Sequence, residues 1–440
     1  MRHATFLGML LLFHPSGLAQ QNAREQKVRA DKAKVEAADS WIYNDMGRGF
    51  AEARRTGKPI VVVLRCIPCE ECVKLDDDLV EGDPVLRPLL DQFVRVRIVG
   101  TNGLDLSLFQ YDTDQSFAVF LLNADGTIYG RFGTRSHRTE WLGDVSLKGM
   151  ARALQGALDL HANYPQNAKN LAGKRGGPPE VASPELFPSL RDKYGAKLDY
   201  DGNVVKSCIH CHQIGDAQRE LYRGRGEAIP ERVLFPYPHP KSIGLKLDPS
   251  EKARIKEVEP DSWAAKAGFR DGDDIESMNG QPLLSMADVQ WVLHQTPAGG
   301  GDILAEVRRG GSEQTLTLRL PGGWRRQGDL SWRVSSWGLR RMVLGGMVLE
   351  KLPDGERPAV KVEGTPLRVK SVGKFGAHAA AHNAGIQPGD ILVSYDGKDS
   401  FPNEGNLLAY AVNAYKPGDR VTIRVLREEK ALEFTLPIQE

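Results

Sequence analysis

The stretch that decides the fold is Cys66-Ile67-Pro68-Cys69-Glu70-Glu71-Cys72, which holds three of the five cysteines of the chain. Before it, the run Ile60-Val61-Val62-Val63-Leu64 is apolar and β-branched, which predicts a buried strand. After it, a helical pattern starts at Cys72. A cysteine pair at a strand-to-helix junction lies near helix N–H groups, which lower the pKa of a thiol. The stretch therefore predicts a reactive dithiol.

The order of predicted elements around this dithiol resembles the thioredoxin fold over residues 45–162. The expected elements after the cysteines are a strand, a hairpin and a closing helix, at 93–99, 117–133 and 147–160. The resemblance implies thiol–disulfide exchange. Both Cys66/Cys69 and Cys69/Cys72 have the CxxC spacing, but counting from Lys58-Pro59 as in the family gives Cys69 as the first cysteine. Cys69 is then the attacking thiol, Cys72 its resolving partner and Cys66 an extra thiol.

Two other readings of the three cysteines stay open. They could form a structural disulfide or buried thiols, or three soft thiolates could hold copper or zinc. Thioredoxin-fold oxidoreductases carry a cis-proline just before the strand equivalent to 117–122, whereas this chain has Asp114-Gln115-Ser116 there. In the family that proline discourages metal binding, so its absence favours the metal reading somewhat.

The first 19 residues have the pattern of a secretory signal. Arg2 and His3 precede the apolar run 6–13, and small residues lead to a cleavage site near Ala19. A charged, Ala-rich helix exposed to solvent is expected over residues 20–44. Both cysteine motifs suit an oxidising compartment, so we expect an exported, periplasmic protein. No later run has the length of a membrane span.

The composition is that of a globular protein of several domains. The 440 residues include 58 Lys and Arg against 57 Asp and Glu. This balance argues against nucleic acid as a partner.

A second cysteine motif, Cys208-Ile209-His210-Cys211-His212, lies in a Pro- and Gly-rich segment expected to be a linker over residues 163–237. Cys-x-x-Cys-His is the attachment signature of c-type haem, with thioethers at Cys208 and Cys211 and with His212 as an iron ligand. A disulfide, or a zinc site that uses His210 or His212, is the alternative. His239 is a candidate distal ligand.

The C-terminal half repeats itself at an offset of 117 residues. Ala267-Gly268 and Gly272-Asp273 recur as Ala384-Gly385 and Gly389-Asp390. The pattern resembles PDZ domains of the bacterial HtrA type, over residues 238–321 and 340–440 with a connector at 322–339. Such domains bind an extended peptide at a sheet edge. The resemblance implies peptide binding at Ile243, Gly244 and Leu245 in the first copy, and the run 342–347 is a candidate for the same loop in the second.

The predicted fold is therefore multidomain: an α/β thioredoxin-like domain, a short helical segment with CxxCH, and two α+β PDZ domains that are partly open barrels. The arrangement resembles exported thioredoxin–PDZ proteins of planctomycete-like bacteria. HtrA-type proteases carry a Ser/His/Asp triad, but the sequence has no GNSGG-like segment. We expect a redox protein with haem c that recruits protein partners through its PDZ domains; its redox partner is unknown. The alternative is a peptide-binding scaffold with structural or metal-binding cysteines.

Overall fold

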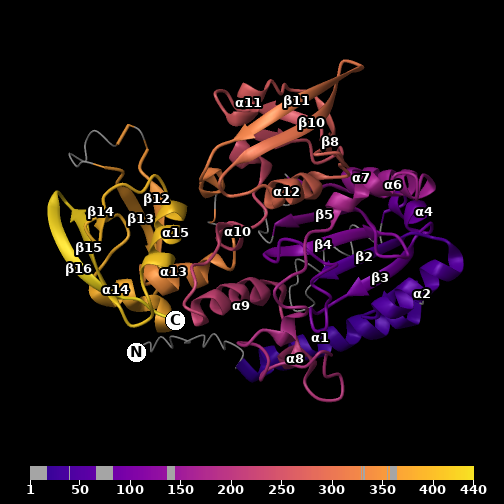
Figure 1. Cartoon of the computed structure of the whole chain (residues 1–440). Coiled ribbons are helices and arrows are strands. Elements are labelled where there is room, and N and C mark those ends of the chain that lie inside the picture. Colours follow the sequence, from indigo (N-terminus) through magenta and orange to yellow (C-terminus); the bar gives the residue numbers. More distant parts are fainter. Residues whose placement is uncertain are drawn as a thin grey trace, which may run out of the picture.

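The computed structural model describes residues 17–38, 40–65, 83–135, 144–328, 330, 332–353, 355–356 and 364–440. It places three α/β units around a central helical segment (Figure 1). We call residues 41–162 the head, residues 238–321 module 1 and residues 336–440 module 2.

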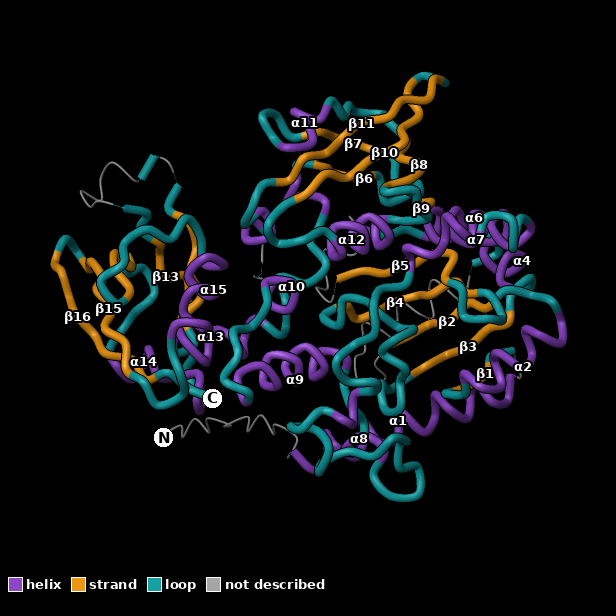
Figure 2. Tube along the Cα trace, in the orientation of Figure 1, coloured by secondary structure: helices purple, strands orange, loops and turns teal. Residues whose placement is uncertain are grey.

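The head is built on a five-stranded sheet in the order β1-β3-β2-β4-β5 (Figure 2). Strands β1, β3 and β2 are parallel, and β4 and β5 are antiparallel to their neighbours. All six residues of β2 are buried, as expected for a central strand covered on both faces. The elements of the head are β1 (Ile42–Tyr43), α2 (Met46–Thr56), β2 (Ile60–Arg65), α4 (Leu86–Leu90), β3 (Val94–Ile98), β4 (Gln115–Leu122), β5 (Ile128–Arg135) and α6 (Leu147–Ala162). The predicted strands, hairpin and closing helix are confirmed.

The segment expected to be a linker is instead part of the core of the head. Phe187, Leu190, Ile209 and Ile214 are buried in one cluster with alternate residues of β2, such as Val62. The Pro and Gly content that suggested a linker reflects turns in a packed segment. Its helices are α7 (Ala168–Leu171), α8 (Val204–Ser207), α9 (Cys211–Gly224) and α10 (Glu231–Leu234), with short 3-10 turns at Ala172–Lys174 and Pro184–Leu186.

The N-terminal helix α1 (Gly17–Ala38) is helical as predicted, but it is docked on the protein. Val28 and Val35 are buried on its inner side. Arg29 donates to the carbonyl oxygen of Tyr200, and Glu25 accepts from the backbone N–H of Val204. The expectation of a solvent-exposed helix was wrong. The face of α1 that packs on the protein carries only a few apolar residues, so the sequence pattern did not indicate this packing. Within the described ranges, no helix combines the length and apolarity that crossing a bilayer requires.

The two modules follow a similar order of elements, although the strands of module 1 form two sheets and those of module 2 form one. A buried aspartate holds an arginine of the following hairpin in each: Asp273 pairs with Arg309 and Asp390 with Arg427, both at 2.7 Å. Module 1 comprises a 3-10 turn at Pro240–Ile243, β6 (Leu245–Leu247), β7 (Ile255–Val258), α11 (Trp263–Ala267), β8 (Asp274–Met278), β9 (Gln281–Pro282), α12 (Met286–Gln295), β10 (Gly301–Arg309) and β11 (Ser312–Leu320). Module 2 comprises α13 (Ser336–Leu344), β12 (Met347–Lys351), β13 (Leu367–Val372), a 3-10 turn at Gly376–Ala379, α14 (Ala380–Ala384), β14 (Ile391–Tyr395), α15 (Glu404–Ala414), β15 (Arg420–Arg427) and β16 (Lys430–Pro437).

Module 1 is packed directly on the head through α12, which lies against β5 (Figure 1). Two glycines make this close approach possible, because a Cβ at Gly130 or Gly156 would lie 2.6 or 2.7 Å from a methyl group of Leu284. Lys174 and Asp288 form a buried ion pair of 3.0 Å in the same interface. All residues from Met286 to Leu293 are buried as a result.

We predict that Leu284→Ala lowers the free energy of unfolding by about 2–5 kcal/mol, because it leaves a cavity between two packed units. The matched control is Leu304→Ala, since Leu304 is 53% exposed and Leu284 only 2%. Urea unfolding followed by tryptophan fluorescence measures both. Equal midpoints for the two variants would contradict the packing described above.

Candidate functional site

The predicted dithiol of Cys66, Cys69 and Cys72 lies outside the described residues, in the segment 66–82. The structure does describe the strand that leads to it. Arg65 ends β2, is buried, and donates to a carboxylate oxygen of Asp31 on α1 at 2.5 Å. Because β2 and β3 are parallel, their carboxyl ends share one edge of the sheet. We call this the carboxyl edge of the head.

The CxxCH segment is pinned to the same carboxyl edge. The carbonyl oxygen of Ile209 accepts from the hydroxyl of Thr101 at 2.8 Å, and the N–H of Ile209 donates to Asn102 at 2.9 Å. Thr101 and Asn102 lie in the turn that follows β3, after Val99 and Gly100. Cys208 is the C-cap of α8, and Cys211 starts α9, whose N-cap is His210.

Both thiols of this motif are directed into protein. Cys208 is 6% exposed, and its Sγ lies where a Cβ on Gly100 would meet it at 3.2 Å. The Sγ of Cys211 accepts a hydrogen bond of 3.1 Å from the Tyr111 hydroxyl. Neither cysteine is in a disulfide. Burial, with a smaller contribution from Cys211, raises the pKa of Cys208 to about 12, and burial also raises the pKa of Cys211. Both groups are therefore protonated thiols at neutral pH.

The two histidine rings of the motif are stacked. The rings of His210 and His212 are parallel within 3°, with centroids 5.8 Å apart. The His212 side chain is 40% exposed, and its Nδ1 is 3.8 Å from a carboxylate oxygen of Asp216. Burial is the main cause that lowers the pKa of His210, followed by the neighbouring His212.

As these side chains lie, they do not fit a covalently attached porphyrin. A haem needs both sulfurs and the iron-binding histidine around one apolar space. Here Cys208 faces Gly100, and Cys211 faces Tyr111. A cavity of about 200 Å³ lies nearby, but neither cysteine lines it. Among the described residues, no group of three or more His, Cys, Asp and Glu side chains could hold a metal ion. Haem c at Cys208, Cys211 and His212 stays a prediction, as do copper or zinc at Cys66, Cys69 and Cys72.

That cavity lies between the head, α9 and α12. Its walls include Tyr111, Gln218, Arg232 and His294. The His294 ring is stacked on Tyr237 at 3.9 Å, and its Nδ1 accepts from the Tyr237 N–H at 3.2 Å. Burial, with nearby arginines, holds the pKa of His294 well below its usual value, so the ring is neutral.

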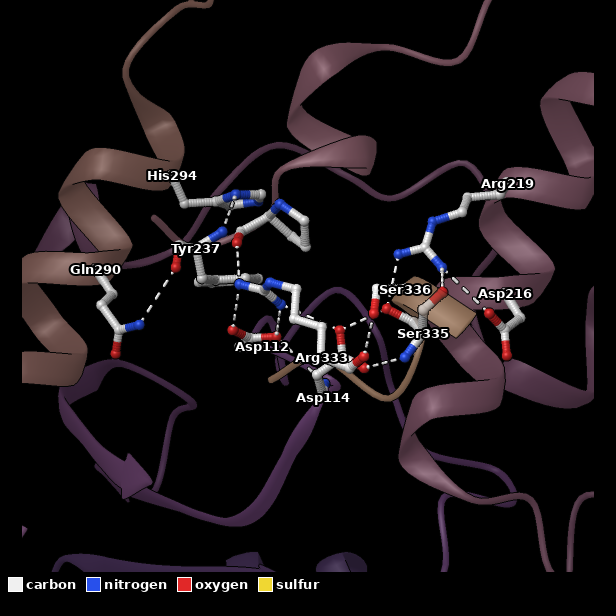
Figure 3. Close-up of polar contacts among 11 residues, drawn as sticks. Asp112, Asp114, Asp216, Arg219, Tyr237, Gln290, His294, Arg333, Ser335 and Ser336 are labelled. Atoms are coloured by element: carbon white, nitrogen blue, oxygen red, sulfur yellow. Dashed lines mark hydrogen bonds and ion pairs between the residues drawn. The ribbon is translucent and has the colours of Figure 1, made fainter. Parts of the chain in front are cut away.

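A buried ionic cluster closes one side of this junction (Figure 3). Arg333, from the connector, donates to both carboxylate oxygens of Asp112 at 2.7 and 2.9 Å and to Asp114 at 3.1 Å. Asp114 also accepts from the hydroxyl and the N–H of Ser335. Arg219 of α9 donates to the Ser335 hydroxyl at 2.8 Å. Three parts of the chain that are far apart in sequence thus meet at one set of charges.

The two carboxylates of the cluster respond differently to burial. For Asp112, burial outweighs the attraction of Arg333 and raises the pKa. For Asp114, burial is again the largest influence, but Arg333, Arg219 and Ser335 together lower the pKa. The sequence analysis missed this cluster, because Arg333 is 219 residues from Asp114 and no local pattern connects them. Its two aspartates occupy the turn before β4, where the thioredoxin resemblance led us to look for a cis-proline.

The predicted peptide-binding residues lie at the start of β6 and are buried. Ile243 is 1% and Leu245 0% exposed, and Gly244 has a φ of +88° that favours glycine. The space between the end of β6 and the start of α12 is a crevice of about 10 Å³. The head covers it with Phe132, Gly133, Asp144 and Val145.

The comparisons with known proteins agree with this architecture in part. A thioredoxin-like family model matches residues 41–124, and a PDZ-domain model matches residues 254–300. The chain therefore contains a thioredoxin-like domain and a PDZ domain.

Among curated proteins, two probable periplasmic serine endoproteases described as DegP-like are similar. That of Pseudomonas fluorescens is 29% identical over 202 residues, which cover 46% of this chain and 40% of the relative. That of Pseudomonas savastanoi is 30% identical over 198 residues, which cover 44% and 39%. The chain thus spans about two fifths of the length of these relatives.

Two solved structures are similar to parts of the chain. The PDZ domain of HtrA3 bound to a phage-derived ligand is 29% identical, with 17% of this chain and 72% of that chain covered and a TM-score of 0.15. A disulphide isomerase from Xylella fastidiosa is 23% identical, with 27% and 86% covered and a TM-score of 0.19.

We predict that Cys208 and Cys211 resist alkylation in the native protein. With a pKa of about 12, Cys208 is ionised to roughly one part in ten thousand at pH 8, so iodoacetamide reacts very slowly. Peptide mapping by mass spectrometry, with and without urea, measures each cysteine separately. The haem prediction has a separate test, which is expression in a host that matures c-type haem. A covalent haem band that disappears in the Cys208→Ser, Cys211→Ser variant would support it, and the absence of a band in wild type would reject it.

We predict that Arg333→Met lowers the free energy of unfolding by about 3–5 kcal/mol, because it leaves two buried carboxylates without their counter-charge. Arg319→Met is the control, since the Arg319 side chain is 78% exposed. Protonating the buried carboxylates relieves the penalty, so Arg333→Met should be less destabilised relative to wild type at pH 4 than at pH 7. A destabilisation of Arg333→Met that is the same at both pH values would show that lost packing, and not the unpaired carboxylates, is its cause.

Proposed function

We propose that this protein is an exported redox protein that exchanges thiols and disulfides through Cys69 and Cys72 and recruits protein partners through PDZ modules. The observation that carries the proposal is the thioredoxin-like sheet. Its central strand β2 ends at Arg65, and the CxxC stretch follows directly. In this fold a dithiol at that edge meets the start of a helix, which stabilises a thiolate.

The proposed reaction uses one thiolate and one resolving thiol. The Cys69 thiolate attacks a sulfur of a partner disulfide, forms a mixed disulfide and releases the other partner sulfur as a thiolate, which takes up a proton. Cys72 then loses a proton and attacks the Cys69 sulfur, which releases the second partner thiolate. The partner gains two electrons and two protons, and the head is left with a Cys69–Cys72 disulfide. A dithiol reductant from outside the chain restores it. The proposal contains no haem step.

Module 2 is proposed as a second PDZ domain and as the unit that recruits partners. Its order of elements is similar to that of module 1, and its outermost strand β12 lies beside α15 (Figure 1). The glycine pair Gly345-Gly346 ends α13 with positive φ angles and leads into β12, as a peptide-binding loop would. Module 1 is the weaker candidate because the head covers its crevice.

Export is proposed from the signal pattern and from the relatives, whose names describe periplasmic proteins. Protease activity is not proposed, since the sequence lacks the serine segment that such enzymes carry.

A scaffold function is the second candidate. Asp114 precedes β4 at the carboxyl edge and is buried under Ser335 of the connector. A partner that docks at this turn would have to displace the connector. Because the connector already occupies this turn, the geometry favours a head that is structural, with partner binding left to module 2.

We predict that Cys69→Ser lowers dithiothreitol-driven insulin reduction by at least about 100-fold, because it removes the attacking thiolate. Cys72→Ser should accumulate a mixed disulfide with the partner, visible on non-reducing gels. Cys66→Ser is the matched control and should stay within about twofold of wild type. Equal turnover in wild type and Cys69→Ser would reject the redox proposal and favour the scaffold.

A further inference from the structure

The cavity between the head, α9 and α12 takes no part in the proposed function. It measures about 200 Å³, and four aromatic side chains line it: Phe109, Tyr111, Tyr237 and Trp291. Trp291 is 1% exposed, so its ring is fixed by packing. A cavity of about 150 Å³ can hold a benzene molecule, so this one accommodates a single aromatic ring with a small substituent. Aromatic side chains around the space favour a planar ring.

Arg219 of α9 brings an unused hydrogen-bond donor to this cavity. Its side chain lines the cavity and is 2% exposed. The terminal nitrogens donate to Asp216 and Ser335. The Nε–H is buried and has no acceptor among the residues that the structure describes. Because an unpaired buried donor is costly, an oxygen atom of a ligand would be stabilised beside it.

His294 of α12 supplies a second donor. Its Nδ1 accepts from the backbone N–H of Tyr237, so the proton of the neutral ring is on Nε2. Within the described ranges, no group accepts a hydrogen bond from this Nε2–H. Figure 3 shows His294 and Arg219 on opposite sides of the buried ionic cluster. The donors therefore come to the cavity from two different helices.

The carboxylates in the cavity wall are already satisfied. Asp114 accepts from the N–H of Ser335 on one oxygen and from the Ser335 hydroxyl on the other. Glu180 accepts from the Tyr222 hydroxyl on one oxygen and from Arg225 on the other. Each carboxylate oxygen of these two residues thus has a donor. A wall with unused donors and occupied acceptors favours a ligand that brings acceptors of its own.

The surroundings of the cavity are positively charged. After burial, the largest influences that lower the pKa of His294 are four arginines: Arg325, Arg232, Arg333 and Arg131. The guanidinium groups of Arg325 and Arg131 donate to backbone carbonyl oxygens, which carry no net charge. Arg232 lines the cavity and is exposed, so it marks the opening to solvent. A positive potential in such a cleft raises the local concentration of anions.

We infer that this cavity binds a small aromatic acid, a single ring that carries a carboxylate. The ring packs among the aromatic side chains, and the carboxylate accepts from Nε of Arg219. The Nε2–H of His294 donates to a second oxygen of the ligand. The cavity is separate from the crevice of module 1, which uses Met286 at the start of α12, whereas the cavity uses His294 near its end. Binding here depends on neither the redox chemistry nor the recruitment of partners.

The test uses the full chain and three probes: 4-hydroxybenzoate, its neutral analogue 4-hydroxybenzamide, and inorganic phosphate. Saturation-transfer difference NMR gives the Kd of each aromatic probe, and phosphate is added as a competitor of 4-hydroxybenzoate. We expect 4-hydroxybenzoate to bind at least about tenfold more tightly than 4-hydroxybenzamide, because only the acid carries a charge that the arginines attract. Phosphate has no ring and should not compete at an equal concentration.

Two variants and a control locate the binding in the cavity. Gln218→Phe fills the space from α9 and should weaken binding of 4-hydroxybenzoate at least about tenfold. Glu220→Phe is the matched control, since Glu220 is exposed on the same helix and does not line the cavity; its Kd should equal that of wild type. Arg232→Gln removes an exposed charge, so it should weaken 4-hydroxybenzoate about threefold and leave 4-hydroxybenzamide unchanged. Near-ultraviolet circular dichroism verifies that each variant is folded.

Several results would overturn binding of an aromatic acid at this site. They are the absence of saturation transfer to 4-hydroxybenzoate in wild type, equal affinity for the acid and the amide, and a folded Gln218→Phe that binds as wild type does. Equal competition by phosphate would overturn it too, because the ring would then contribute nothing. If Gln218→Phe does not fold, Arg232→Gln decides: a lower affinity ratio of acid to amide supports the site, and an unchanged ratio rejects it.

Discussion

The structure depends on the ion pair between Arg333 and the two aspartates that precede β4. Three charges are buried together, and each would be costly alone. The pair can form only when the connector, α9 and the head are all in place, because Ser335 and Arg219 complete it. The ion pair is therefore complete only when these three parts of the chain are packed together correctly. Apolar contacts join the same segments, since Leu234 and Phe235 are buried in one cluster with residues of module 2.

The ion pair also explains why the carboxyl edge of the head is crowded. The CxxCH segment, the start of β4 and the connector all lie near the end of β2. From Ser335 the polar contacts continue into module 2, since Ser336 accepts from Arg340, and Arg340 holds Glu404. A continuous polar chain therefore runs from the carboxyl edge of the head to β12 of module 2.

The sequence was a good guide to local structure and a poor guide to contacts between distant segments. Alternation and β-branching located β2, β4 and β5 correctly, because these strands are set by residues close together in the chain. The repeat at 117 residues located both modules. The segment 163–237 was misjudged because Pro and Gly indicate turns whether or not the turns are packed. The site at Arg333 could not be predicted, since each of its residues is ordinary in its own stretch and only the fold brings them together.

The burial of α12 has a consequence for how such a chain can change over time. PDZ domains often pass between proteins as portable units, but module 1 shares its helix with the head. Gly130 and Gly156 leave room for one side chain of the size of Leu284. A substitution on either surface therefore requires a matching substitution on the other. The match at residues 254–300 marks inherited similarity and not a unit that stands by itself. Head and module 1 are expected to coevolve as one domain.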